Sequence, residues 1–402
     1  MKCDIVVVGA GPAGSTAAKY LAKKNFEVVL VDKHKFPRPK PCGGGVPIGT
    51  VKRFPYVEDY NLIDSFSYGG FIHSPSLKYS IELNEEKPIV AMVSREKFDH
   101  GLVNIAVDSG ATFVDEKRVK DVHISKENAR VVLQDGSSIE SKMLVGADGV
   151  SSVVAKKSGL ATCRMINVCV FQEYLVGERN IVEYATEQRL CHIHLMYHGI
   201  PGYAWIFPKK DRFNIGVGEF MPYKKYAPKS VRLRDVYKSY FQMLKQKSLI
   251  PKDLGMGRCR GGSIPVFPLE KTYAYRLLLC GDAAGFINPI SGGGIHFAME
   301  SGELAARVIA KSLESDNFND KFLMQYQRLW KEAFGKDLDT FARFINIWLR
   351  QTERFIRIAC KDKRFIHIAS EFLYGNLRIR DYRSKILLYY LQDWMKDLFG
   401  ML

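Results

Sequence analysis

One stretch of this sequence combines residue types that bind a negatively charged ligand. Asp282 follows the apolar run 277–280, which is typical of a buried strand, and three glycines, 292–294, precede a helical pattern over 296–313. Backbone N–H groups at a helix start favour negative charge, and glycine lets a ligand approach them closely. The stretch predicts an anion-binding site, and a helix N-cap is the plainer interpretation of Asp282.

A second glycine stretch near the start of the chain predicts a dinucleotide site. Gly9, Gly11 and Gly14 follow the apolar strand pattern 3–9 and open a helical pattern over 12–24, and Asp32 ends the next strand pattern, 27–32. The glycines permit a tight turn beside a pyrophosphate, and the aspartate accepts hydrogen bonds from a ribose hydroxyl. A purely structural glycine turn is the alternative.

Two further groups of residues suggest an apolar binding surface. Strand alternation places Tyr203, Trp205 and Phe207 on one face of a strand, where they can line an apolar slot or pack as an ordinary sheet face. The loop around Cys42, with glycines at 43–45, allows its backbone to approach a planar ring, or is simply a tight turn holding an inert thiol.

The elements that must position these residues follow from hydrophobic periodicity. Residues 33–50 are rich in Pro, Gly and Lys and predict a loop, and 66–93 predict antiparallel strands. The further expected elements are a helix over 95–109, a strand over 111–114, a β-meander over 119–141 with its turn at Asp135-Gly136, and a buried strand over 143–145.

Strand patterns dominate from about 165 to 265, with one helix over 231–247, and the chain is helical from about 320 onward. We therefore predict the α/β class, with a doubly wound Rossmann-like domain, an antiparallel-sheet domain and a helical C-terminal region. The expected boundaries are 1–65 with 92–160 and 266–318 for the first, 66–91 with 161–265 for the second, and 319–402 for the last.

Composition limits the possible partners and locations. The net charge of +16 suits an acidic partner or an anionic membrane surface, and nucleic acid is disfavoured because no zinc-finger spacing or basic tail is present. The region 343–386 holds 11 Lys and Arg against 4 Asp and Glu, interleaved with aromatic residues, which fits a lipid-facing surface or packed amphipathic helices.

We expect a cytoplasmic protein, peripheral on the membrane, with no signal peptide and no disulfide framework. We also expect no metal site, because His192 and His194 have no carboxylate near them in sequence.

The motifs resemble those of the FAD-dependent group that includes aromatic hydroxylases and geranylgeranyl reductases. The glycine turn with Asp32, the run 146–152 around Asp148 and the stretch around Asp282 carry this resemblance over roughly residues 1–310. The resemblance implies FAD as cofactor, with Asp282 near its ribityl–phosphate part. The FAD contacts implied are Gly9, Gly11, Ala13, Gly14, Asp32, Lys33, Cys42, Gly43, Gly45, Arg95, Val119, Asp148, Gly281, Asp282, Gly293, Gly294 and Ile295.

Residues 203–208 resemble the Tyr-x-Trp-x-Phe-Pro signature of the reductases, although position 200 is Ile where a proline is expected. This implies FAD-dependent saturation of geranylgeranyl chains in membrane lipid precursors, with Tyr203, Trp205 and Phe207 binding substrate and Cys42 supplying a proton or gating the flavin. The electron donor, ferredoxin or reduced nicotinamide, stays open. The alternatives are a flavin monooxygenase or halogenase acting on an aromatic substrate, a quinone-linked electron-transfer flavoprotein, and a lipid-binding flavoprotein without turnover.

Overall fold

The computed structural model describes residues 1–161, 165–226 and 231–398 and divides into two compact units. Unit 1 comprises residues 1–40, 95–165 and 264–339, and unit 2 comprises 41–94, 166–263 and 340–402. Each unit is assembled from three separate segments of the chain, so both depend on contacts between residues far apart in sequence.

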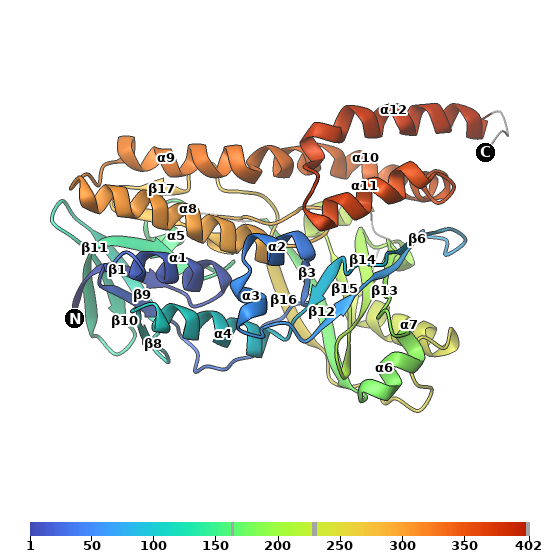
Figure 1. Cartoon of the computed structure of the whole chain (residues 1–402), viewed down its shortest axis with the longest axis horizontal. Coiled ribbons are helices and arrows are strands. Elements are labelled where there is room, and N and C mark those ends of the chain that lie inside the picture. Colours follow the sequence, from blue (N-terminus) through green and yellow to red (C-terminus); the bar gives the residue numbers. More distant parts are fainter. Residues whose placement is uncertain (162–164, 227–230, 399–402) are drawn as a thin grey trace. The chain divides into compact units, whose positions relative to one another are not determined.

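Unit 1 is built on a mostly parallel sheet in the order β17-β18-β11-β1-β2-β8, in which every pair from β18 to β8 is parallel (Figure 1). Its strands are short apolar runs such as Val28–Val31, which are buried on both faces as parallel strands must be. The strands are β1 Lys2–Val8, β2 Val28–Val31, β8 Thr112–Val114, β9 Val119–Ile124, β10 Ala129–Leu133, β11 Ser138–Gly146, β17 Tyr273–Ala274 and β18 Leu277–Leu279.

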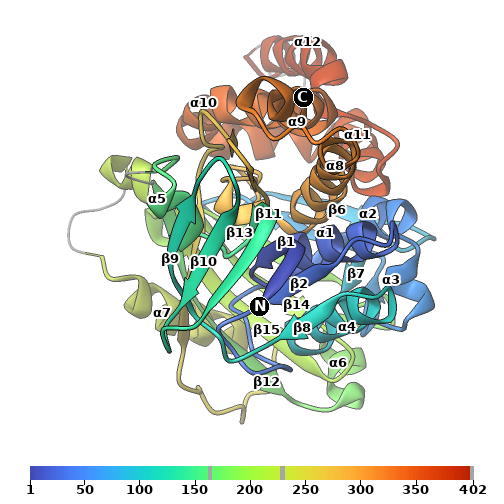
Figure 2. The same ribbon diagram turned by 90° about the vertical axis from the view of Figure 1, so that its left-hand side faces the viewer.

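The meander β9-β10 joins this sheet through β11, and Figure 2 shows these strands fanning out beside the parallel ones. We expected the meander to end near 141 and a separate strand to occupy 143–145. Instead, β11 runs without a break from Ser138 to Gly146, because no Gly, Pro, Asn or Asp interrupts residues 138–145.

The helices of unit 1 bury small side chains against one another and the sheet. Helix α1 packs along α8, and both contribute alanines to the same core as β1 and β18. The helices are α1 Pro12–Ala22, α4 Arg95–Asp108, α5 Val153–Lys157, the short η3 Gly281–Ala283, α8 Ile295–Glu314, α9 Asp320–Trp330 and the π-helical η4 Lys331–Gly335.

Unit 2 is built on a sheet in the order β16-β12-β15-β14-β13-β5-β6, with a smaller sheet β3-β7-β4. The pairs β12–β15, β15–β14, β14–β13 and β5–β6 are antiparallel, as expected for this sheet, whereas the pair β5–β13 is parallel, so the expectation was wrong at that pair. The strands are β3 Gly45–Pro47, β4 Ser65–Ser67, β5 Gly69–His73, β6 Ser80–Asn84, β7 Val90–Met92, β12 Ile166–Leu175, β13 Cys191–Leu195, β14 Gly202–Pro208, β15 Arg212–Glu219 and β16 Arg260–Pro265.

Helices cover both faces of the larger sheet of unit 2 (Figure 1). Residues of α7 pack with Ala204 and Ile206, and residues of α10 to α12 pack with Ile193 and Tyr203 on the opposite face. The helices are α2 Ile48–Arg53, α3 Tyr56–Asp59, α6 Glu178–Ala185, η1 Tyr197–Gly199, η2 Met221–Tyr226, α7 Leu233–Gln246, α10 Lys336–Ala359, α11 Lys363–Tyr374 and α12 Ile379–Leu398.

The fold confirms the predicted α/β class with a second, strand-rich part and a helical C-terminal region. The segment 33–50, expected to be a loop, contains β3 and the start of α2. The predicted boundaries differ from the observed units, and the predicted third domain is not separate, because residues 340–402 belong to unit 2. Residues 41–65 lie in unit 2 because β3 and β4 both pair with β7, and 319–339 lie in unit 1, where α9 packs on α8.

Within the described part of the chain, no helix is both long enough and apolar enough to cross a membrane. The described cysteines are all free thiols, and Cys163 lies outside the described residues. No group of three or more metal-binding side chains gathers among the residues that the structure describes.

Candidate functional site

The three glycines of the turn after β1 have two distinct roles. Gly9 has a φ of +101° and a side chain there would overlap the Ala147 carbonyl, while a side chain at Gly14 would overlap the carbonyl of Gly9. A Cβ at Gly11 would meet only Nη2 of Arg38, at 3.9 Å. Two glycines therefore close the turn, and Gly11 leaves open space at the start of α1, where a phosphate group fits.

Asp32 fastens the end of β2 to this turn. Its Oδ2 accepts a hydrogen bond from the backbone N–H of Ala10 at 2.9 Å, and its Oδ1 accepts one from the N–H of His34 at 2.9 Å. Each carboxylate oxygen keeps a second lone pair for a hydroxyl group. Asp32 is buried and Lys33 beside it is exposed, so the pair lies at the edge of the sheet where a ribose is expected.

The stretch around Asp282 lies against the same turn through a contact of small residues. Gly281 has a φ of +57°, and a Cβ there would lie 2.9 Å from Cβ of Ala13 in α1. A Cβ at Gly294, the residue before α8, would lie 3.4 Å from Oδ1 of Asp282. Gly281, Asp282, Gly293, Gly294 and Ile295 thus gather at the start of α8, whose first residue has no side-chain cap.

A buried arginine and a partly buried one add positive charge that the sequence analysis predicted only in part. Arg95 binds Asp99 through Nε and Nη2 at 2.7 and 2.8 Å, and Nη1 of Arg38 lies 3.0 Å from the same carboxylate. Asp99 is fully buried, so two guanidinium groups share one negative charge. The surplus positive charge lies beside Gly11 and suits a pyrophosphate.

Lys40 adds a further positive charge, which interacts with Asp282. Burial lowers the pKa of Lys40, and the negative charge of Asp282 opposes that shift. Sequence reasoning missed both Arg38 and Lys40. The available signal was four basic residues, 33, 35, 38 and 40, in the loop that follows the acidic end of β2.

Two other predicted cofactor residues, Asp148 and Val119, lie next to or within the elements α5 and β9. Asp148 accepts hydrogen bonds from Val153 N at 2.7 Å, from Val154 N at 3.2 Å and from the Ser152 hydroxyl, so its carboxylate caps α5, and burial raises its pKa. Val119 is the buried first residue of β9. Its predicted contact with the adenine end of FAD stays a prediction.

In unit 2, the loop of residues 41–45, here called the Cys42 loop, packs on the strand β14. A Cβ at Gly43 would lie 2.8 Å from the Phe207 ring and 3.5 Å from Nε1 of Trp205, and one at Gly45 would lie 3.8 Å from Phe207. The N–H of Gly44 donates to Sγ of Cys42 at 3.3 Å. The structure therefore brings Cys42, Gly43 and Gly45 together with Trp205 and Phe207.

Tyr203, Trp205 and Phe207 share one face of β14, as strand alternation predicts, and are here called the aromatic face. The ring centroids are 5.7 Å apart for Tyr203 and Trp205, and 6.3 Å apart for Trp205 and Phe207. A Cβ at Gly216 would overlap the indole of Trp205, so the glycine makes room for that ring. Burial raises the pKa of Tyr203, and its neighbours Cys169 and Cys42 raise it further.

A buried polar network holds the Cys42 loop on the aromatic face. Asn214 accepts a hydrogen bond from Nε1 of Trp205 at 2.7 Å and donates to the Cys42 carbonyl at 3.0 Å and to Glu173 at 3.1 Å. Glu173 forms an ion pair with the buried Lys209. Sequence reasoning missed these residues, although isolated charges within otherwise apolar strands were the visible signal.

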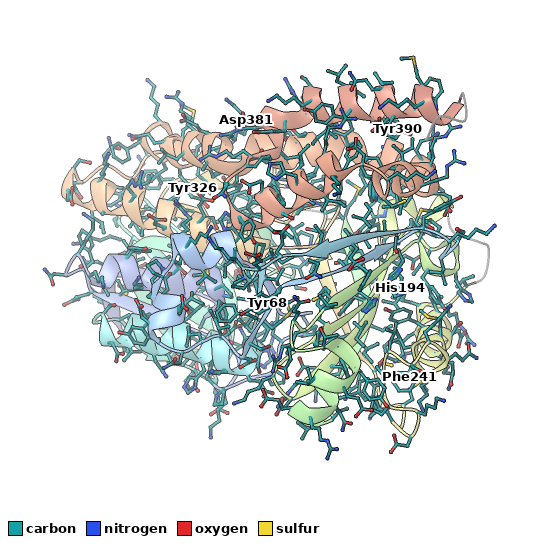
Figure 3. All side chains as sticks on the ribbon, turned by 45° about the vertical axis from the view of Figure 1, so that its right-hand side comes forward. Tyr68, His194, Phe241, Tyr326, Asp381 and Tyr390 are labelled. Atoms are coloured by element: carbon teal, nitrogen blue, oxygen red, sulfur yellow. The ribbon has the colours of Figure 1, made fainter. Side chains whose placement is uncertain are left out.

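Three histidines stack on the opposite face of the same sheet. The His73 ring lies 5.3 Å from His192 and 4.2 Å from His194, Nε2 of His73 is 3.0 Å from Nδ1 of His192, and His194 meets the Tyr240 hydroxyl at 3.0 Å (Figure 3 labels His194). Burial lowers the pKa of His73 and of His192 to about 4, and that of His194 further. These residues form an uncharged structural cluster beneath α7.

This cluster predicts an acid-labile unit 2. Unfolding lets the histidines regain their ordinary pKa near 6.5. Between about pH 6.5 and 4 the unfolded chain therefore binds more protons than the folded protein, and stability decreases as the pH is lowered. Each histidine should remove roughly 1 kcal/mol of unfolding free energy per pH unit in that window. Urea titrations at several pH values measure the slope, which His194→Gln should reduce. His367→Gln, at an exposed histidine of α11 outside the cluster, is the control variant, and a slope in His194→Gln equal to that of the control would contradict the assignment.

Comparison with known proteins identifies the family to which the chain belongs. Residues 2–329 match the family described as FAD binding domain. The chain is 30% identical to the digeranylgeranylglycerophospholipid reductase of Methanococcus vannielii over 345 residues, which cover 83% of this chain and 84% of that protein.

Solved structures show the same fold. A geranylgeranyl bacteriochlorophyll reductase-like protein from Thermoplasma acidophilum has a TM-score of 0.77 at 23% identity, with 95% of this chain and 99% of that chain covered. The flavin-dependent brominase Bmp2 has a TM-score of 0.71 at 21% identity, with 96% and 100% covered. FAD is therefore the cofactor, and the chain belongs to the family of FAD-binding flavoproteins that includes the archaeal digeranylgeranylglycerophospholipid reductases.

Proposed function

We propose that this protein is an FAD-dependent reductase that saturates the double bonds of isoprenoid chains in membrane lipid precursors. The observation that carries the proposal is the aromatic face under the Cys42 loop, on a chain whose relatives bear the name of lipid reductases. A long apolar substrate suits this arrangement because aromatic rings bury large apolar area with little loss of side-chain freedom.

In this proposal, unit 1 holds the cofactor. Gly11 leaves room for the pyrophosphate, Arg38 and Arg95 supply positive charge, Asp32 accepts from the ribose, and Asp282 lies beside the start of α8. Reduced FAD supplies a hydride when bound. The N–H groups at Gly294 and Ile295 are suited to a negatively charged ring edge, because helix starts carry partial positive charge.

Unit 2 holds the isoprenoid chain. Tyr203 packs, with Ile193, against an apolar cluster that includes Leu195 from the sheet, Ile356 from α10 and Phe365 from α11. An unactivated alkene develops no enolate for the protein to stabilise, so the chain must be held in a fixed orientation and kept dry. Addition of a hydride to one alkene carbon then requires a proton for the other, and Cys42 is the proposed donor.

This role for Cys42 predicts a selective loss of rate. Cys42→Ser should keep its flavin absorbance, because the glycine turn and Asp32 are untouched, and should slow alkene reduction by roughly a hundredfold, the low end of general-acid catalysis. Single-turnover measurement with pre-reduced protein isolates the chemical step. Cys259→Ser, at a thiol in the same unit, is the matched control and should react normally. A normal rate in Cys42→Ser would remove Cys42 from the mechanism.

The proposal includes contact with a membrane surface. Leu387, Leu388, Leu391 and Met395 are exposed by 46–53% along one stripe of α12, and basic residues of the same helix lie at 380, 383, 385 and 396. Apolar and basic side chains together favour an interface with anionic lipid, as does the net charge of +16.

The decisive experiment is anaerobic incubation of dithionite-reduced protein with geranylgeranyl-bearing phospholipids and with free geranylgeranyl diphosphate, followed by mass spectrometry. Products heavier by pairs of hydrogen atoms support the proposal and identify the accepted substrate. No added hydrogen on any isoprenoid, together with oxygen consumption in the presence of a small aromatic substrate, would instead establish the monooxygenase alternative.

A further inference from the structure

A basic pocket lies in unit 2, away from the Cys42 loop in sequence and on different elements. It has a volume of about 780 Å³ and is formed by the turn between β5 and β6 and by α10. The lining residues are Pro75, Ser76, Lys78, Tyr79, Arg350, Gln351, Glu353, Arg354 and Arg357.

The lining carries a strong excess of positive charge. Lys78, Arg350, Arg354 and Arg357 face one carboxylate, Glu353, which gives a formal charge of +3 (four cations minus one anion). The three arginines follow the spacing i, i+4 and i+7, which places them along one face of α10. Guanidinium groups present planar pairs of donors that match the oxygens of a phosphate group.

The single carboxylate of the pocket has a structural task. Glu353 accepts hydrogen bonds from the Ser76 N–H at 2.9 Å, from the Ser76 hydroxyl at 2.5 Å and from the Ser74 hydroxyl at 3.3 Å. These bonds fasten the β5–β6 turn to α10, so the wall that carries Lys78 is ordered against the arginine face. Neutral donors already solvate the carboxylate oxygens, which lessens its repulsion of a bound anion.

The pocket adjoins a cluster of buried apolar side chains. Tyr79 lines the pocket and also packs in the apolar cluster that contains Ile193, Tyr203 and Ile356. The same cluster therefore reaches from the aromatic face to the pocket rim within unit 2. A charged site at one end of a continuous apolar cluster matches a molecule with an anionic head and a long apolar chain.

We propose that this pocket binds a phosphate group, and that the phosphate belongs to the head of the amphiphilic substrate whose chain lies along the apolar cluster. The choice of a lipid occupant rests on the proposed function, whereas the phosphate site itself is tested by binding alone. Failure of this proposal is thus distinguishable from failure of the reductase proposal, since binding is measured without turnover.

The test uses the full-length protein with its FAD and compares a pocket variant with a charge-matched control. Lys78→Glu combined with Arg350→Glu reverses two exposed charges of the pocket. Lys210→Glu combined with Lys252→Glu makes the same charge change at exposed lysines of unit 2 outside the pocket. Equal thermal transitions and flavin content establish that both variants are folded.

Two probes distinguish the source of the phosphate. Calorimetry measures binding of inorganic pyrophosphate, and sedimentation measures binding to phosphatidylcholine vesicles with and without phosphatidic acid. We expect the pocket variant to bind pyrophosphate roughly a hundredfold more weakly than the control, the effect of two lost charge-assisted contacts. A matching loss of binding to phosphatidic acid vesicles supports a lipid headgroup.

The other outcomes also decide the proposal. Loss of pyrophosphate binding with unchanged vesicle binding would support the phosphate site and overturn its lipid source. Equal pyrophosphate affinity in the pocket variant and the control would overturn the site. A milder Arg350→Gln variant, which keeps amide donors, should fall between the wild-type protein and the double variant, and its failure to do so would count against the site.

Discussion

Replacement of Gly11 by valine is expected to give folded protein that carries no FAD. Gly11 has φ −78° and ψ −176°, an extended conformation that valine adopts readily, and a Cβ there meets nothing closer than Arg38 at 3.9 Å. The unfolding free energy of the apoprotein should therefore change by less than about 1 kcal/mol. The new side chain occupies the space that the pyrophosphate needs, so FAD affinity should fall by roughly a hundredfold or more.

Two other glycine substitutions make this prediction specific. Gly9→Val should disrupt folding, because φ is +101° and its side chain would overlap the Ala147 carbonyl. Gly255→Val, in unit 2, has nothing within 4 Å of its Cβ and should retain FAD and stability. Circular dichroism reports folding and visible absorbance reports bound flavin. A folded Gly11→Val protein with normal flavin content would refute the proposed position of the pyrophosphate.

The cofactor residues could be predicted from sequence because each motif is local. The glycines and Asp32 lie within 32 residues and follow a strand, a helix and a second strand, so periodicity alone places them at one sheet edge. The observed bond between Ala10 and Asp32 is what this arrangement requires. Gly281 and Asp282 were likewise predictable, since they directly follow the apolar strand β18, which ends at Leu279.

Most of the contacts that sequence reasoning missed are long-range. Asp99 forms an ion pair with Arg95, which lies one helical turn away, and another with Arg38, 61 positions earlier in the chain. Only the ion pair with Arg38 requires the tertiary fold. The Cys42 loop was predicted to belong to the cofactor domain, as part of residues 1–65. The pairing of β3 with β7 instead places it in unit 2. Strand pairing between distant segments leaves no local pattern in a single sequence.

Glu173→Gln is expected to cause the largest loss of stability among changes that preserve shape. The Lys209 side chain is only 2% exposed, and Glu173 is its ion-pair partner. A buried ammonium left without its counter-charge costs about 3–5 kcal/mol of unfolding free energy. Glutamine keeps an acceptor oxygen for Asn214, so the loss reflects the charge rather than the hydrogen bond. Urea unfolding measures it directly.

A double variant tests whether the unpaired charge of Lys209 causes the loss of stability. Glu173→Gln with Lys209→Met removes both charges and should recover most of the lost stability, since replacing a buried ion pair by neutral groups is often close to neutral. If the double variant is as unstable as the single one, unpaired charge is not the cause. Trp205 fluorescence should shift in the single variant, because Asn214 connects Glu173 to the indole and to the Cys42 carbonyl.

The acid response separates this pair from the histidine cluster. Burial raises the pKa of Glu173, but the ion pair with Lys209 and the hydrogen bonds outweigh it and hold that pKa below its ordinary value. Stability from the pair is therefore present above the ordinary carboxyl pKa and is lost as the pH falls through the lowered one. The histidine contribution is lost at higher pH, between about 6.5 and 4. Acidification should thus weaken the α7 face of the sheet first, while the network that holds the Cys42 loop persists until the carboxylate is protonated.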